Sequence, residues 1–314
     1  MARTLKIFSG SSNPELARLT AKHLGVPLGR SYVASFPNGE TRVRIEENVR
    51  GLDVFLVQSV CAPVDKNLVQ LLIMMDAVRR ASADRITAVV PYFGYARQEK
   101  KTAGREPISA KLVANLLAVA GADRILTMDL HAPAIEGFFD IPVDHLRAAG
   151  LLGEKVKELA LDNAVVGSPD AGGVARAEDF SRRLGGSDLF VVFKRRDTPD
   201  DVTPLHLVGD VRGRVAIIID DIISTGKSLI TAADSLLEGG AKEVHACAVH
   251  ADFTEDVVKV LESSRLKSIL VTDTIPIPNQ RPPDSKIEVC STARIFAETI
   301  DRIHRHESVS ALFS

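Results

Sequence analysis

Two adjacent carboxylates, Asp220 and Asp221, follow a run of five apolar residues at Val215–Ile219. A short turn rich in hydroxyl groups comes next, at Ser224–Ser228, and apolar residues with helical spacing begin behind it. Acids at the end of a buried strand can meet the hydroxyl groups of a ribose or a metal ion. The amides and hydroxyls of the turn can bind a phosphate at the start of a helix. The order strand, acids, turn and helix therefore predicts a site for a sugar phosphate.

Two other interpretations of this stretch have to be weighed. Gly226-Lys227-Ser228 is also the ending of a P-loop, but that motif needs a glycine five residues before its second glycine, and position 221 is aspartate. An ordinary strand-to-helix turn with Ser or Thr as cap is the structural alternative. Paired acids followed so closely by three hydroxyl side chains favour the ligand site.

A second cluster, Pro91–Lys101, combines aromatic and cationic side chains behind a predicted strand. Arg97 is suited to a phosphate, and Tyr92 or Phe93 could border a base. Ligands of open α/β sheets bind at this end of the strands. A solvated basic loop is the alternative.

Three further clusters occupy the same position, just beyond a predicted strand. One combines an acid with a histidine and suits a metal or nucleotide. Another combines an acid with two glycines and suits an anion or metal ion. The third is a cationic segment that can close over a polyphosphate and expel water. These clusters are Asp129 with His131, Asp170 in Gly167–Arg176, and Lys194–Arg196 at the start of Phe193–Pro204.

Strand-like and helix-like segments alternate along the chain, which predicts an α/β fold with mostly parallel sheets flanked by helices. The alternation of Thr41, Val43 and Ile45 within Glu40–Glu46 predicts a half-exposed antiparallel hairpin. The predicted strands are Leu5–Phe8, Val54–Val57, Ile86–Val90, Ile125–Met128, Ala164–Gly167, Leu189–Phe193, Val215–Ile219, Val244–Val249 and Ser268–Thr272. The predicted helices are Pro14–Leu24, Lys66–Ala81, Ser109–Ala120, Gly173–Leu184, Ser228–Gly239, Glu255–Ser263 and Thr292–His304.

At 314 residues the chain is long enough for two domains with separate cores. The similar segments SADRI, GADRI and GAKEV each join a helix to a strand, as expected for two related halves or simply for repeated α/β units. We expect one domain at 1–148 and a second at 149–291, with the C-terminal segment 292–314 packing back on the first.

Composition excludes several functional classes. The net charge of −2 gives no basic field for nucleic acid or membrane, and no apolar run approaches a membrane span. Three widely spaced cysteines, Cys61, Cys247 and Cys290, form no CxxC pair and predict free thiols in a reducing compartment. The expectation is a cytoplasmic protein of enzyme size.

Several motifs, in order along the whole chain, resemble one enzyme family. They are FSGSSNPELA, FPNGETRVRI, PYFGYARQEKK, ISAKLVANLL, MDLHAPAIEGFFDIPVD, SPDAGGV, VAIIIDDIISTGKS and ESVSALFS. Together they resemble the ribose-phosphate pyrophosphokinases, whose two similar domains have the type I phosphoribosyltransferase fold. The resemblance implies that ATP and ribose 5-phosphate meet between these domains.

The resemblance also implies roles for individual residues. Lys194 and Arg196 would be the catalytic loop cations, and His131 and Asp170 would hold Mg²⁺. ATP would be bound by a hairpin that a neighbouring subunit contributes and by a loop of the first domain, and ribose 5-phosphate by the acids and the turn behind them. The ATP residues would be Phe36, Asn38, Gly39, Glu40, Arg97 and Gln98, and the ribose 5-phosphate residues Arg196, Asp220, Asp221, Ser224, Thr225, Gly226, Lys227 and Ser228.

The implied reaction transfers the diphosphoryl group of Mg-ATP to the C1 hydroxyl of ribose 5-phosphate, with AMP as the leaving group. The family is also associated with hexamers, with activation by phosphate and with inhibition by ADP. Two positions depart from the family pattern: Ser224 stands where many relatives have an acid, and the segment DTPDDVTP after Arg196 is unusually acidic. The possible regulatory residues are Arg50, Ser82, Arg105, Ser308 and Ser310.

Two alternatives to this activity are open at the level of the sequence. A phosphoribosyltransferase would share the 215–228 motif, but it would not need the ATP hairpin or the cationic segment. A non-catalytic, synthetase-associated regulatory subunit would keep the fold and lose its catalytic residues. Lys194, Arg196, His131 and Asp170 are all present, which favours an active enzyme.

Overall fold

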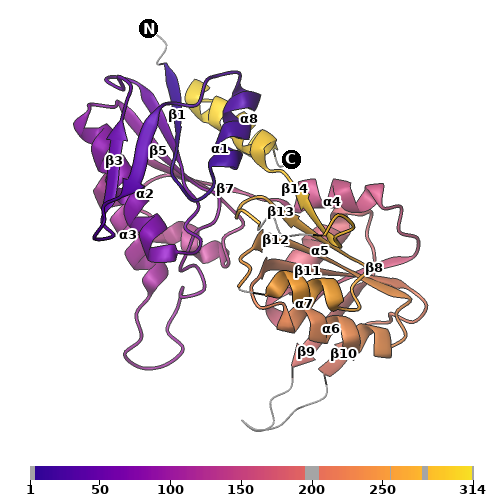
Figure 1. Cartoon of the computed structure of the whole chain (residues 1–314). Coiled ribbons are helices and arrows are strands. Elements are labelled where there is room, and N and C mark those ends of the chain that lie inside the picture. Colours follow the sequence, from indigo (N-terminus) through magenta and orange to yellow (C-terminus); the bar gives the residue numbers. More distant parts are fainter. Residues whose placement is uncertain (1–3, 195–204, 255, 278–281, 313–314) are drawn as a thin grey trace. The chain divides into compact units, whose positions relative to one another are not determined.

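The structure is a computed structural model that describes residues 4–194, 205–254, 256–277 and 282–312. The chain divides into two compact units (Figure 1). The first unit comprises Met1–Arg147, Thr274–Pro276 and Ser291–Ser314, and the second comprises Ala148–Asp273 and Ile277–Cys290. Each unit is an α/β layer structure around its own apolar core.

Five of the described strands form the parallel sheet of the first unit. Their side chains are almost entirely buried in the central strands, as expected for a parallel sheet covered on both faces. The order across the sheet is β1 (Leu5–Ser9), β4 (Asp53–Val57), β5 (Arg85–Val90), β6 (Arg124–Met128) and β7 (Val143–Leu146).

Helices α2 (Val64–Arg80) and α3 (Ser109–Ala120) pack into the main core of the first unit. Helix α1 (Pro14–Leu24) begins where the Asn13 side chain accepts a hydrogen bond from the Leu16 amide, and it ends at Gly25 with φ +70°. Helix α8 (Ala293–Arg305) lies beside α1 (Figure 1). It is tied to the sheet by His304, whose Nδ1 lies 2.8 Å from an Asp53 carboxylate oxygen.

A separate hairpin in the first unit pairs β2 (Ser31–Ser35) with β3 (Thr41–Ile45) in antiparallel register. The alternation within 40–46 had predicted this hairpin, and the prediction is confirmed. Two short 3-10 helices complete the unit: η1 (Pro133–Phe138) and η3 (Ser310–Leu312).

Seven of the described strands form the sheet of the second unit, which is parallel except at its β10 edge. The order is β10 (Leu205–Val208), β9 (Leu189–Lys194), β8 (Ala164–Ser168), β11 (Val215–Ile223), β12 (Glu243–Ala251), β13 (Ser268–Thr272) and β14 (Ile287–Cys290). The flanking helices are α4 (Ala149–Glu158), η2 (Ala171–Gly173), α5 (Val174–Arg183), α6 (Lys227–Glu238) and α7 (Val257–Ser263).

The predicted fold class, an α/β protein with mostly parallel sheets flanked by helices, is confirmed. One boundary in the site is wrong: the strand predicted to end at Ile219 continues to Ile223. Ile222 and Ile223 remain in register with His250 and Ala251 of β12, so the two acids lie within the strand and not behind it. Among the described residues, no helix is long and apolar enough to cross a membrane.

Candidate functional site

The carboxyl ends of β8 and β11 lie side by side in the second unit, with Gly167 opposite Ile218. The chain passes from β8 to β9 on one side and returns by β11 on the other. This reversal is a topological switch point, where open α/β sheets bind ligands. Asp170 follows β8 and the acid pair lies on β11, so the fold gathers both predicted sites of this unit at one sheet edge.

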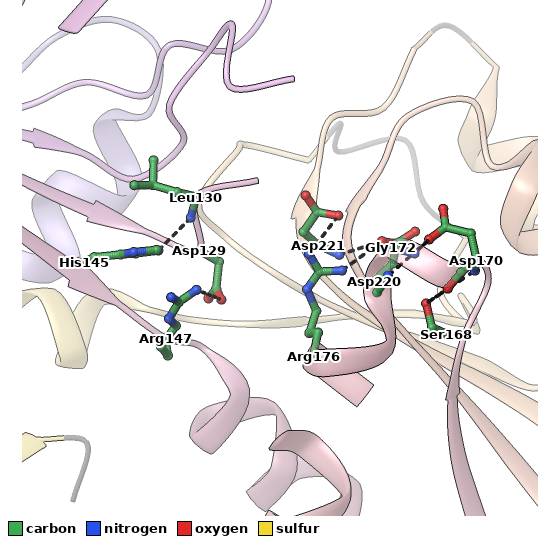
Figure 2. Close-up of polar contacts among 11 residues, drawn as sticks. Asp129, Leu130, His145, Arg147, Ser168, Asp170, Gly172, Arg176, Asp220 and Asp221 are labelled. Atoms are coloured by element: carbon green, nitrogen blue, oxygen red, sulfur yellow. Dashed lines mark hydrogen bonds and ion pairs between the residues drawn. The ribbon is translucent and has the colours of Figure 1, made fainter. Parts of the chain in front are cut away.

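Arg176 of α5 bridges the two acids of β11 (Figure 2). Its Nη1 lies 3.3 Å from Oδ1 of Asp220, and its Nη2 lies 3.3 Å from Oδ1 of Asp221. The Asp221 amide donates a further hydrogen bond of 2.8 Å to Asp220 Oδ1. The Asp220 side chain is 26% exposed and that of Asp221 7%. A planar guanidinium suits this bridge because it can serve two carboxylates at once.

The electrostatics of this pair are unusual. Burial, together with the neighbouring Asp221, raises the pKa of Asp220 to about 7, and Arg176 opposes the rise. Near neutral pH the Asp220 carboxyl is therefore divided between its protonated and ionised forms. It can donate a hydrogen bond in one form and accept in the other, which suits a partner such as a sugar diol.

The turn behind β11 leads directly into the first turn of α6. Gly226 is its N-cap, is buried, has φ +71° and has no side chain that could cap the helix, while the Lys227 amide donates a long hydrogen bond of 3.5 Å to Thr225 Oγ1. A Cβ at this position would lie 3.2 Å from the Leu261 side chain, so glycine suits both the backbone and the space. Thr225, Lys227 and Ser228 are exposed around this N-terminus. A helix start that has glycine as its N-cap and exposed hydroxyls and a lysine beside it is suited to a phosphate group.

Asp170 lies on a rigid turn between β8 and η2. Its Oδ1 accepts hydrogen bonds from the amides of Gly172 at 2.9 Å and Gly173 at 3.2 Å, while Ser168 Oγ donates to its backbone carbonyl at 2.6 Å. A Cβ on Gly173 would fall 2.2 Å from Ser168 Oγ, so only glycine fits. The exposed carboxylate is consequently held in one orientation. Carboxylate oxygens are ligands that Mg²⁺ prefers.

The first unit contains a cavity of about 310 Å³ at the loop that follows β5. Tyr95, with φ +65°, donates its hydroxyl to Asp65, and the Ser109 hydroxyl donates to Gln98. This cavity brings together the predicted ATP residues Arg97 and Gln98. Its lining residues are Val64, Asp65, Tyr92, Tyr95, Ala96, Arg97 and Gln98.

The two aromatic candidates of this loop have different roles. Tyr92 lines the cavity, and its place beside a base stays a prediction. Phe93 does not: it is 2% exposed and makes an edge-to-face contact with Phe139, with ring centroids 5.6 Å apart. The prediction for Phe93 is replaced by a role in the core, because its neighbours fill its surroundings with apolar atoms.

The whole chain resembles enzymes of one kind. The N-terminal domain model of ribose phosphate pyrophosphokinase matches residues 5–121, and the phosphoribosyl synthetase-associated domain model matches residues 187–314. A ribose-phosphate pyrophosphokinase of Gloeobacter violaceus is 49% identical over 98% of this chain and 93% of its own. The chain belongs to the ribose-phosphate pyrophosphokinase family.

Further relatives agree with this assignment. The ribose-phosphate pyrophosphokinase of Caldanaerobacter subterraneus subsp. tengcongensis is 49% identical over 99% of this chain and 98% of its own. The crystal structure of phosphoribosylpyrophosphate synthetase from Mycobacterium smegmatis superposes with a TM-score of 0.92 at 43% identity, covering 97% of this chain and all of that one. The family resemblance predicted from the motifs is therefore confirmed, and with it the enzyme class.

Several predicted ATP residues lie on the hairpin of the first unit. Asn38 Oδ1 accepts a hydrogen bond of 3.2 Å from the Glu40 amide, and Gly39 has φ +90° in the tip. Phe36 is 42% exposed, with the Arg42 guanidinium 5.4 Å from its ring centroid. The tip is thus a tight turn that presents an aromatic face to solvent in this single chain.

The metal and loop candidates are distributed over both units. His131 is exposed and belongs to the first unit, whereas Asp170 belongs to the second. Among the described residues, no group of three or more His, Cys, Asp or Glu side chains is arranged to hold a metal ion. Lys194 ends β9 but its side chain is outside the described part, as is all of Arg196.

The possible regulatory residues all belong to the first unit. Ser82, with φ +66°, accepts a backbone hydrogen bond of 2.8 Å from Gly51, the neighbour of Arg50. Arg105 also has a positive φ of +67°, and the Ser308 carbonyl accepts a 3.0 Å hydrogen bond from Arg302. Ser310 begins η3. Their proposed regulatory role stays a prediction.

Sequence reasoning missed Arg176, although it is the last residue of the Gly167–Arg176 cluster. Its partners are 44 and 45 positions away in the sequence, so only the adjacency of β8 and β11 reveals the contact. It also missed His145 and Arg147, whose contacts with the segment around His131 are described below.

Proposed function

We propose that this protein transfers the diphosphoryl group of Mg-ATP to the C1 hydroxyl of ribose 5-phosphate, giving 5-phosphoribosyl 1-pyrophosphate and AMP. The observation that carries the proposal is the second-unit site, where the bridged acids Asp220 and Asp221 precede a helix start with glycine as its N-cap. Full-length identity of 49% to ribose-phosphate pyrophosphokinases supports the same activity.

In this proposal the second unit binds the sugar. The acid pair accepts hydrogen bonds from the ribose hydroxyls, and the turn Ser224–Ser228 binds the 5-phosphate through backbone amides and hydroxyls. Ser224 contributes a hydroxyl donor to this turn. Two anchors on one rigid strand and helix fix the C1 hydroxyl in orientation, which is the main requirement of an in-line transfer.

The first unit binds the nucleotide. Arg97 is one of the residues that line the 310 Å³ cavity, so its guanidinium can hold a phosphate there, and Tyr92 can border the base. We propose that the hairpin residues Phe36 and Asn38–Glu40 contribute to the ATP site of a neighbouring subunit in a homo-oligomer. The exposed Phe36 ring supports this assignment, because an aromatic face of that kind suits a purine.

Chemistry at phosphorus requires charge neutralisation and no covalent nucleophile from the protein. Negative charge builds on the transferred group and on the oxygen that leaves with AMP, and Lys194 and Arg196 can neutralise it. Bound Mg²⁺ would supply further positive charge between the phosphates. Asp170 offers the hard oxygen ligand that this ion prefers, and His131 is the second residue assigned to it.

The proposal is tested by incubating the full-length protein with Mg-ATP and ribose 5-phosphate and measuring AMP and the phosphoribosyl product. We expect one AMP for each product molecule and no ADP. Inorganic phosphate should be varied, since the family is associated with phosphate activation. Absence of AMP at every phosphate concentration would refute the activity and would favour a non-catalytic subunit.

Replacement of Lys194 separates catalysis from folding. Lys194→Ala should lower turnover by about 10²–10³-fold, the usual cost of one group that stabilises charge in the transition state. The matched control is Lys242→Ala, which removes an exposed lysine between α6 and β12 and should leave turnover unchanged. Near-normal turnover in Lys194→Ala would exclude its assigned role.

We also propose a hexamer that responds to phosphate and ADP through Arg50, Ser82, Arg105, Ser308 and Ser310, in the cytoplasm. Light scattering coupled to size-exclusion chromatography measures the mass in solution. Substitution of Arg105 by Gln should weaken the response to both effectors without altering turnover at saturating phosphate. An unchanged response would remove Arg105 from the site.

A further inference from the structure

The turn that leads to His131 is held by the last two residues of β7 and by Arg147, which follows them. Figure 2 shows two of these residues, His145 and Arg147, beside Leu130 and Asp129. The Leu130 amide donates a 2.8 Å hydrogen bond to Nε2 of His145, and the Asp129 amide donates a 3.0 Å bond to the carbonyl of Leu146. Nη1 of Arg147 lies 3.7 Å from the Asp129 carboxylate. Side chain, backbone and charge contacts therefore converge on two residues of the turn.

The turn needs such support because of its backbone. Asp129 has φ +38°, in the left-handed region that residues with a Cβ seldom adopt. It is also buried, with only 7% of its surface exposed. A conformation of this kind persists only where the surrounding structure fixes it, and such positions cluster at functional sites.

His145 contacts the chain on both sides of His131. Its Nε2 accepts from Leu130, one residue before His131, while its Nδ1 bonds to Glu136 of η1, five residues after it. The backbone N–H can only donate, so Nε2 carries the lone pair and Nδ1 carries the proton. The His145 side chain is 4% exposed.

The charges around this imidazole agree with a neutral ring. Burial lowers the pKa of His145 below its usual value, and Arg147 lowers it further, while Glu136 acts in the opposite direction. A neutral ring of fixed tautomer is a directional tether, with one acceptor and one donor aimed at different segments.

We infer that His145 is a positioning residue for the reaction: by joining Leu130 to Glu136 it fixes the segment that carries His131. The inference rests on the proposed function, in which His131 serves the Mg-nucleotide. No contact between His145 and substrate is required. Groups that orient a functional histidine from behind are commonly worth 10–100-fold in metal affinity or activity.

Three substitutions resolve the two tethers. His145→Gln keeps an amide near the position of Nε2 and can still accept from Leu130. His145→Asn keeps an amide near Nδ1 and can contact only Glu136. His145→Leu removes both contacts at similar volume. Turnover should fall about 10–100-fold in the Leu variant and about 10-fold in the Asn variant, and stay within about 5-fold of wild type in the Gln variant.

The kinetic pattern distinguishes positioning from general damage. In His145→Leu, the Mg²⁺ concentration for half-maximal turnover should rise about 10-fold, whereas KM for ribose 5-phosphate, which is bound by the second unit, should change less than 3-fold. Hydrogen–deuterium exchange gives a readout that needs neither Mg²⁺ nor turnover. Amides of 127–136 should exchange faster in the Leu variant than in wild type and the Gln variant.

The matched control is His245→Leu in the second unit. His245 is also a buried histidine, 7% exposed, whose Nδ1 bonds to Ser268 at 2.7 Å. This variant loses an imidazole of similar burial and should keep the wild-type Mg²⁺ requirement and turnover. Thermal midpoints measured for all four variants show which of them fold.

Wild-type turnover and Mg²⁺ requirement in folded His145→Leu would overturn the inference, as would an equal rise in the KM values of every substrate. If His145→Leu fails to fold, the contrast between the Gln and Asn variants decides in its place, and equal activities would overturn the inference. Absence of AMP formation by the wild-type protein would instead refute the proposed function. The exchange rates of 127–136 would still test the tether.

Discussion

Replacement of Asp220 by Asn should stabilise the folded protein while removing a carboxylate that we propose binds ribose. The pKa of Asp220 rises from 3.8 to about 7, a difference of about 3 units, and each unit corresponds to about 1.4 kcal/mol. The charged form is thus disfavoured in the folded state by about 4 kcal/mol at most. Because the side chain is 26% exposed, we expect a gain of about 1–4 kcal/mol in the free energy of unfolding.

The gain should depend on pH in a defined direction. A carboxyl group whose pKa is raised on folding binds its proton more tightly in the folded state, so its ionisation destabilises that state. Near pH 4 Asp220 is protonated in the folded protein, and the variant and wild type should be almost equally stable. The advantage of Asn should grow between about pH 4 and 7 and remain constant above that range.

Urea unfolding followed by circular dichroism, without ligands, at intervals from pH 4.5 to 8.5 measures this difference. Asn is a suitable replacement because its Oδ1 can still accept from the Asp221 amide and from Arg176. The control is Asp234→Asn on α6, where the side chain is 41% exposed and pairs with Arg265 at 3.7 Å. Such a surface pair contributes little, so its effect should be small at every pH.

Two results would contradict the reasoning. A variant that is less stable than wild type at pH 8 would show that the acid contributes net stability through Arg176. A gain that does not vary with pH would show that its origin is not the ionisation of Asp220. In either case the pKa of about 7 and its assigned cause would have to be abandoned.

Four other substitutions or probes test separate parts of the structure. Arg176→Met should raise KM for ribose 5-phosphate about 10- to 100-fold, because it leaves two neighbouring carboxylates without their charged donor. Arg176→Lys should recover part of the loss. A KM of Arg176→Met equal to that of wild type would contradict this. Gly226→Ala, at φ +71°, should cost about 1–2 kcal/mol of stability in urea unfolding and weaken sugar-phosphate binding. Asp53→Ala should cost about 3–5 kcal/mol, because this fully buried acid pairs with Arg85; a loss below 1 kcal/mol would refute that estimate. Cys290, whose pKa burial raises to about 11, should not react with a disulfide reagent at pH 8 until the protein is denatured.

The sequence predicted the elements around the site where local signals were strong. Helix α1 has the predicted bounds, since Asn13-Pro14 and Gly25 are respectively start and stop signals. Helix α3 was also placed correctly, and it ends at Gly121 with φ +116°. These ends depend on backbone preferences of single residues, so no tertiary contact is needed to find them.

Elements of mixed polarity were harder to find. The strand β7 has the sequence VDHL, with two polar residues among four, and it was not predicted as a strand. Its Asp144 pairs with Arg124 on the neighbouring β6, and its His145 turns inward to the segment around His131. Both polar side chains have partners that lie far away in the sequence, so hydrophobic periodicity gives no signal for them.

The acids of β11 show why the end of a strand can be predicted too early. Asp is depleted in strands, so two of them at 220 and 221 predict an end of the strand. Here Arg176 compensates their charge, and the pairing of Ile222 and Ile223 with β12 continues beyond them. The two carboxylates therefore lie near the carboxyl end of β11 but still inside the strand, where pairing with β12 fixes the backbone that carries them.

At the carboxyl ends of the strands in both units, residues assigned to a ligand, or residues next to them, are held by side chains from another element. In the second unit Arg176 reaches from α5 to hold the acids, and in the first unit His145 and Arg147 reach from the end of β7 to hold the turn before His131. In the second unit the held side chains are themselves assigned to the ligand, whereas in the first unit the held residues are Asp129 and Leu130, directly before His131. Neither holder has a sequence motif of its own, because its spacing to the held residue is set by sheet order. Motifs therefore identify the groups that would meet the substrates, and the sheet topology identifies the groups that keep them in place.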